Sequence, residues 1–210
     1  SCSQPDPGPG SLFETILSES PSIPGKPEYL GSPYLSPGDR AYLVGHQDGS
    51  FPELGWHIKG EMGGLWAHPI KLMDGFSARL KTGEETVVLG GDGPDGESGT
   101  PADRFTNFPM ANRHTWELKA LGLEVARWQF VPDGSEGVLL EYTLHNKTPH
   151  PLTLTFEFRG YADLRPTWLG ERTGMRDARD RAVYDSTDLA WMVKDENNPW
   201  WVVLGTPRKP

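Results

Sequence analysis

The sequence has little of three things that define common protein classes: cysteine, basic charge and long apolar runs. Cys2 is the only cysteine among 210 residues, which excludes an internal disulfide and a cysteine-based metal site. The formal net charge of -9 argues against a nucleic-acid partner, because a phosphate-binding surface needs clustered Lys and Arg. No run of about 18 apolar residues occurs, so no segment is predicted to cross a membrane as a helix.

Helical periodicity is also scarce, whereas turn-forming residues are abundant. The chain contains 20 Pro and 25 Gly, which is typical of many short strands joined by tight turns. Eight Trp, six Tyr and eight Phe supply bulky core material although only 36% of the residues are hydrophobic. We therefore expect an all-β fold, an antiparallel β-sandwich.

Alternating apolar and polar residues mark the strands. The clearest case is the 152–159 segment, in which Leu152, Leu154, Phe156 and Phe158 alternate with polar residues and predict one apolar and one wet face. A bulge is expected at Asp74-Gly75, where the alternation breaks. Further strands are predicted at 41–44, 69–80, 86–89, 115–119, 123–131, 138–145, 189–194 and 200–204.

The first 40 residues differ in composition from the rest. They are rich in Pro, Gly and Ser and are predicted to form a tether or an extended N-terminal segment, followed by a β-sandwich domain at 41–210. Ser11 and Glu14 have the spacing of a helix capping box. Cys2, followed by QPDPGPGS, resembles the lipid-attachment end of a bacterial lipoprotein, which implies a periplasmic or cell-surface location; the alternative is an incidental free thiol.

The Gly45–Asp74 stretch concentrates the residue types that contact sugars. It holds three of the six histidines and two of the eight tryptophans, set between glycines that allow tight turns. Indole rings can stack on sugar faces, and imidazole and carboxylate groups can bind hydroxyls. The candidate carbohydrate-binding residues are Trp56, His57, Glu61, Trp66 and His68.

Each candidate also has a structural explanation. The tryptophans could fill the core or an interface, and Lys71 with Asp74 could form a structural ion pair. A His-Glu-His metal site at His57, Glu61 and His68 fits no known ligand spacing, so we predict neither a metal nor another cofactor. The acidic loop with Asp92, Asp95 and Glu97 lacks calcium-loop spacing and is expected to be a solvated turn.

Two further polar segments are predicted to be structural or to bind sugar or a neighbouring domain. One contains Asp103, Arg104, Asn107, Asn112, Arg113 and His114, and Arg–carboxylate hydrogen bonds would explain it as well as a sugar-binding edge would. The other is the charged run at 171–181, which is expected to be a solvated loop or a contact with a further domain.

The GWHIKGEMGGLWAHPIKLMDGF segment resembles the N-terminal domain of bacterial glycogen-debranching-enzyme-like (α/α)6-barrel glycoside hydrolases. The resemblance extends from about Tyr42 to the end, and its specific part is 47–76. It implies a β-supersandwich of galactose-mutarotase-like shape that packs on a C-terminal (α/α)6 catalytic domain. That domain would carry the two catalytic carboxylates and is absent here, so we expect a truncated glycosidase, and no catalytic residue transfers to this chain.

Three functions compete. The first is the non-catalytic accessory domain that this resemblance implies, acting on glucans or glucosides. The second is a mutarotase-type epimerase with His57 or His68 as acid and Glu61 as base. The third is a free-standing carbohydrate-binding module. The first predicts that Trp56, His57, Glu61 and Trp66 are exposed as one wall of a sugar pocket.

Overall fold

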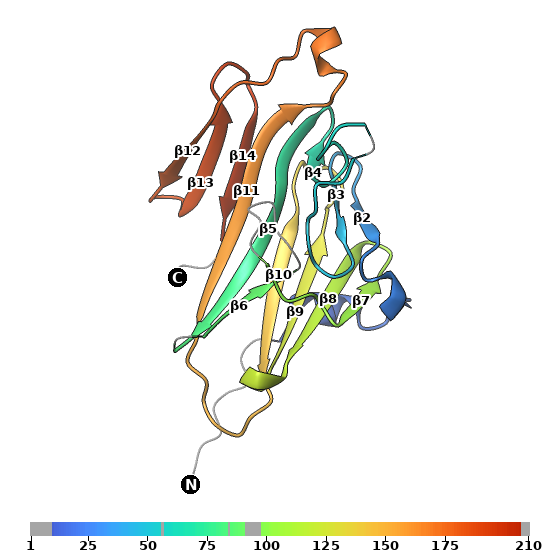
Figure 1. Cartoon of the computed structure of the whole chain (residues 1–210), viewed down its shortest axis with the longest axis vertical. Helices are drawn as coiled ribbons and strands as arrows, with labels where there is room; N and C mark the ends of the chain where they lie inside the picture. The colour runs from blue at the N-terminus through green and yellow to red at the C-terminus, as the bar shows by residue number, and fades with distance from the viewer. Residues whose placement is uncertain (1–9, 56, 84, 91–97, 207–210) are drawn as a thin grey trace.

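The computed structural model describes residues 10–55, 57–83, 85–90 and 98–206, and in this part of the chain the fold is an all-β antiparallel sandwich. Sheet A has the order β1-β7-β8-β9-β10. Sheet B has the order β11-β5-β4-β3-β2, with β6 also paired to β5, and sheet C has the order β12-β13-β14. Figure 1 shows sheet C beside β11 and β5, on the side away from β2.

The strands of each sheet and the helices have the following bounds. Sheet A consists of β1 (Ile23–Pro24), β7 (Arg104–Asn107), β8 (Ala111–Leu118), β9 (Leu123–Phe130) and β10 (Leu139–Asn146). Sheet B consists of β2 (Pro33–Pro37), β3 (Tyr42–His46), β4 (Gly64–Ala67), β5 (Ile70–Thr82), β6 (Glu85–Leu89) and β11 (Thr155–Pro166). Sheet C consists of β12 (Asp180–Asp185), β13 (Ala190–Asp195) and β14 (Trp201–Gly205). The helices are α1 (Leu12–Leu17), η1 (Pro27–Tyr29), η2 (Lys119–Leu121) and η3 (Gly170–Thr173).

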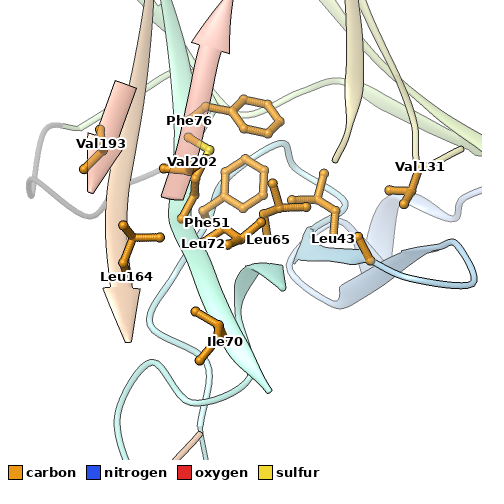
Figure 2. Packing of buried hydrophobic residues seen from close by; sticks show 12 residues of the cluster. Leu43, Phe51, Leu65, Ile70, Leu72, Phe76, Val131, Leu164, Val193 and Val202 are labelled. Atoms are coloured by element: carbon orange, nitrogen blue, oxygen red, sulfur yellow. The ribbon is translucent and has the colours of Figure 1, made fainter. Parts of the chain in front are cut away.

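Two apolar clusters hold the layers together. The larger cluster joins Leu43, Phe51 and Phe76 to Val193 and Val202 of sheet C, as Figure 2 shows. The smaller one joins Ala78 and Leu80 of β5 to Trp116 of β8 and Val125 of β9. Burial of these side chains removes apolar area from water, at about 25 cal/mol per Å², and is the main force that packs the sheets.

The bulge predicted at Asp74 is confirmed. β11 pairs Tyr161 with Gly75 and Ala162 with Met73, so Asp74 is left out of the ladder. A bulge re-aims the side chains on its two sides. The result is that Asp74 turns toward Lys71 and Arg165 on the outer face of sheet B.

A polar strip crosses the interior of the sandwich. Arg127 is fully buried and donates from Nη1 to the Gly49 carbonyl at 3.0 Å. Its guanidinium carbon lies 5.6 Å, 5.1 Å and 5.5 Å from the ring centroids of Phe51, Phe76 and Trp116. Three aromatic faces thus offset part of the desolvation of this cation.

The N-terminal segment lies on the sheets from residue 11 onward. Ser11 caps α1 by accepting the Glu14 N–H at 3.0 Å, so the Ser11 half of the predicted capping box is confirmed. β2 pairs with β3 and buries Tyr34 and Ser36. Residues 11–37 therefore do not form a free tether, whereas Cys2 lies outside the described residues.

Candidate functional site

The candidate site is the outer face of sheet B beneath the glycine-rich loop at 51–63. Tyr42, Trp66 and Lys71 are cross-strand partners on β3, β4 and β5, so their side chains share that face. Trp66 is only 2% exposed because the loop covers it, and its Nε1 donates to the Gly63 carbonyl at 3.0 Å. The loop therefore covers the Trp66 ring on this face of sheet B.

Two cations hold the loop down at one carbonyl. Gly60 O accepts from Lys71 Nζ at 2.8 Å and from Arg165 Nη2 at 3.1 Å. Both cations also contact Asp74 Oδ1, at 2.5 Å and 3.2 Å respectively. The structural pair predicted for Lys71 and Asp74 is thus confirmed. Gly60 has φ +77°, and a Cβ there would lie 2.6 Å from Arg165 Nη2, so both backbone and space favour glycine.

Charge pairing sets the electrostatics of this cluster. Burial lowers the pKa of Lys71, and its hydrogen bond to Asp74 opposes that effect. Arg165 Nη1 lies 2.9 Å from Asp163 Oδ2, while burial raises the pKa of the Asp163 carboxyl. The groups face one another, which suits a rigid support better than proton transfer to a substrate.

The structure separates the predicted binding residues. His57 and His68 are exposed, and Glu61 is half-buried. The expected exposure of Trp66 is wrong, because the loop folds back over its indole. Trp56 lies outside the described residues.

The hydrogen bond between Glu61 and His57 runs to the backbone of His57. The Glu61 Oε1 atom accepts the backbone N–H of His57 at 3.1 Å. The His68 ring instead stacks near Trp66, at 6.1 Å between centroids. Among the residues that the structure describes, no three His, Cys, Asp or Glu side chains lie together so as to hold a metal ion.

Sequence reasoning missed Trp168. This residue follows β11, is 53% exposed, and its ring centroid lies 6.5 Å from that of His57. A lone tryptophan just after the end of β11 was the available signal, but only the pairing of β11 with β5 brings it to the loop. His57 and Trp168 together form an exposed imidazole–indole pair.

The polar segment that contains Asp103 and Arg104 carries ion pairs around Arg104. Arg104 binds the carboxylates of Glu117 and Glu124, and Glu117 N donates to Asp103 Oδ2 at 2.7 Å. His114 is fully buried between the sheets. The expected Arg–carboxylate hydrogen bonds are thus present at Arg104. In the charged run, residues 170–173 form η3 and residues 180–185 form β12, so the expectation of a loop holds only between them. The acidic loop with Asp92, Asp95 and Glu97 lies outside the described residues.

Comparison of the chain with known proteins gives no match. No family model, no curated protein and no solved structure matches it. Within the described ranges, no helix is both long and apolar enough to cross a membrane.

Proposed function

We propose that this chain is a non-catalytic carbohydrate-contacting domain of a glycoside hydrolase. It lends the 51–63 loop to the sugar pocket of an (α/α)6 catalytic domain. The observation that carries the proposal is the exposed pair of His57 and Trp168, 6.5 Å apart between ring centroids. An indole face packs on the C–H groups of a sugar ring, and an imidazole beside it can bind a hydroxyl.

The support beneath the pair favours binding. Lys71 and Arg165 fix the loop through Gly60, so His57 is carried on a segment that is held in place before a ligand arrives. A preorganised loop loses less conformational entropy on binding. The pairing of Lys71, Arg165, Asp74 and Asp163 with one another favours this role over the epimerase alternative.

Sheet C supplies a surface that suits the catalytic domain. Val183, Met192 and Val203 are cross-strand partners on one face of this sheet. Val183 is 49% exposed and Val203 is 61% exposed, and Trp201 beside them is 50% exposed. Contiguous exposed apolar side chains are typical of protein interaction sites. We therefore place the domain contact on this face.

Titration of the 210-residue chain with maltooligosaccharides, followed by NMR and calorimetry, tests the proposal. We expect weak binding that shifts the resonances of His57 and Trp168 and is lost in Trp168→Ala. The matched control is Trp191→Ala, which truncates a similarly exposed indole, 51% exposed, on sheet C. An absence of any shift at His57 and Trp168 would refute the sugar contact.

The affinity decides between the two binding functions. An accessory domain forms only one wall of a pocket, so the chain alone should bind weakly. Tight binding by the isolated chain would instead favour a free-standing carbohydrate-binding module with the same two residues at its centre. In that case the exposed row on sheet C would not need a catalytic domain to cover it.

A further inference from the structure

Strand β12 forms the outer edge of sheet C and leaves one side of its backbone open. It pairs with β13 and with no other strand that the structure describes. Figure 1 shows it as the outermost strand of the sheet, on the side away from β14. Its four central residues are all exposed, and Val183 and Tyr184 are 49% and 47% exposed. An edge strand of this kind presents unpaired N–H and C=O groups to a further strand.

Other edge strands of the fold are blocked. β1 and β2 contain prolines, which cannot donate to a ladder. The edge of β6 is occupied, because Thr100 N donates to the Val88 carbonyl at 2.8 Å. β12 contains no proline, so its backbone can extend the sheet.

The outward side chains of β12 carry opposite charges at its two ends. Side chains alternate between faces along a strand, so Arg181, Val183 and Asp185 share the outer face of sheet C. Arg181 lies directly opposite Lys194 on β13, and like charges in this position repel. An acidic side chain on the open side of Arg181 would offset that repulsion.

Asp185, at the other end of the strand, is the acidic counterpart. Its Oδ1 atom accepts the backbone N–H groups of Thr187 at 2.7 Å and Asp188 at 3.2 Å. These bonds lower the pKa of Asp185, so its carboxylate is ionised at neutral pH. Its neighbour on β13 is Ala190, which carries no charge, so Oδ2 can pair with a cation from the open side.

A second copy of β12 supplies both missing partners at once. When two copies run antiparallel with their Val183 residues opposite each other, Arg181 of each copy lies opposite Asp185 of the other. A contact about a two-fold axis makes every such pair twice. The same register sets Ala182 opposite Tyr184, so a small side chain leaves room for the exposed ring.

The neighbouring register is less favourable. With Ala182 opposite Val183, the Asp180 and Asp185 carboxylates would lie opposite each other, and like charges in a directly opposed pair are destabilising. A slip of one residue also moves side chains to the wrong face. The charges therefore select the register that is centred on Val183.

We propose that the edge of β12 is an interface between two copies of this chain. The two three-stranded sheets C join there into one continuous sheet, with the two-fold axis at Val183. The axis of an antiparallel pair is perpendicular to the sheet, so both outer faces lie on the same side. This inference does not rest on the function proposed above, because it uses the strand edge and leaves the 51–63 loop free.

The size of the contact sets the expected affinity. Each copy contributes one strand of six residues, so the buried area falls in the class below about 1,200 Å² that is typical of transient complexes. We expect a reversible equilibrium of monomer and dimer, with a dissociation constant in the micromolar range.

Sedimentation velocity of the 210-residue chain, at concentrations rising into the submillimolar range, tests the proposal. Arg181→Glu should weaken dimerisation by more than about tenfold, because it sets two acidic side chains opposite each other twice. It also gives Lys194 an acidic neighbour within the sheet, so the fold itself should not suffer. The matched control is Arg172→Glu, which makes the same charge change at an exposed residue of η3 and should leave the dimer intact.

Disulfide crosslinking tests the register. Opposed residues of an antiparallel pair lie about 4.5–5.5 Å apart between Cα atoms, inside the range of about 4.4–6.8 Å that disulfides span. In a Cys2→Ser background, Val183→Cys should therefore crosslink two chains under mild oxidation. Val203→Cys is the control, because Val203 is 61% exposed but lies on β14, at the far side of the sheet. The proposal is overturned if the chain stays monomeric throughout, if the two arginine variants dimerise alike, or if Val183→Cys crosslinks no faster than Val203→Cys.

Discussion

The buried imidazole of His114 makes the stability of this protein depend on pH in a calculable way. Its ring lies 5.0 Å from the rings of both Tyr34 and Phe105, and the side chain is fully buried. Nε2 is 3.3 Å from the His46 carbonyl, which assigns the proton to that nitrogen. Burial lowers the pKa of His114 well below its usual value, and the charge of Arg127 adds to the effect.

The sign of the pH effect follows from proton uptake. In the unfolded chain an imidazole gains a proton as the pH falls through about 6.5, whereas His114 in the fold stays neutral. The unfolded state then binds more protons, so the free energy of unfolding falls with the pH. Between pH 7.5 and pH 5.5 this single group should remove about 1.4 kcal/mol of stability.

The assay is urea unfolding followed by circular dichroism at both pH values, for the unmodified chain and for His114→Gln. Glutamine can still donate to the His46 carbonyl but cannot titrate, so the loss between the two pH values should shrink by about 1.4 kcal/mol. Burial also lowers the pKa of His46, and that share remains in the variant. His145→Gln, at an exposed strand end, is the control. An equal pH dependence in His114→Gln and the unmodified chain would refute the reasoning.

Three other predictions concern sheet B. Lys71→Met should lower the free energy of unfolding by about 2 kcal/mol in the same urea assay, and the loss stays at this size because Asp74 keeps Arg165 as a partner. Lys59→Met removes an exposed ion pair and should cost under about 0.5 kcal/mol. Gly60→Ala should lower the free energy of unfolding by about 1–2 kcal/mol, which is more than Gly83→Ala should. Both glycines have positive φ, but only Gly60 has a close neighbour, so equal losses would contradict the contact with Arg165. The hydrogen bonds from Lys81 and Arg159 lower the pKa of Glu157 to about 2. The stability that Glu157 contributes should therefore be present above the unfolded pKa near 4.5 and disappear as the pH falls toward 2. Glu157→Gln should lose less stability over this pH range than the unmodified chain, and an equal loss would count against the prediction.

The strand predicted at 152–159 is only partly correct, because β11 begins at Thr155 and the expected apolar face leaves Phe156 38% and Phe158 40% exposed. The last hairpin was predictable from the sequence, and two other strands were not. The hairpin of β13 and β14 around residues 195–200 follows from two apolar runs and a polar turn. β12, in contrast, has the charge-rich sequence Asp180–Asp185 and pairs only with β13 among the described strands. β2 contains two prolines, which edge strands tolerate and which hide them from pattern reasoning.

The faces of β9 show why sequence patterns predict elements better than environments. Arg127 points into the sandwich, where rings from three separate segments surround it. Trp128 points outward yet is 1% exposed, because α1 covers it from more than 100 residues away. Local alternation holds no information about either partner. Long-range contacts therefore decide which side chains of β9 are buried.

The loop at the centre of the candidate site was predictable from the sequence, but only part of its contacts was. The glycine-rich stretch does form a loop against sheet B, and the pairing of Lys71 with Asp74 follows from their short spacing. The burial of Trp66 depends on the path of the loop, and the approach of Trp168 depends on the register of β11 with β5. Neither the path nor the register is visible in the residues themselves.

The docking of α1 has a consequence for how the chain is made. The Ser11 hydroxyl donates to Glu141, across 130 positions of sequence. At about 5–20 residues per second, a ribosome adds that length in roughly 7 to 26 seconds. The segment around α1 is thus synthesised well before its partner strand β10, and it stays open to chaperones and proteases throughout that interval.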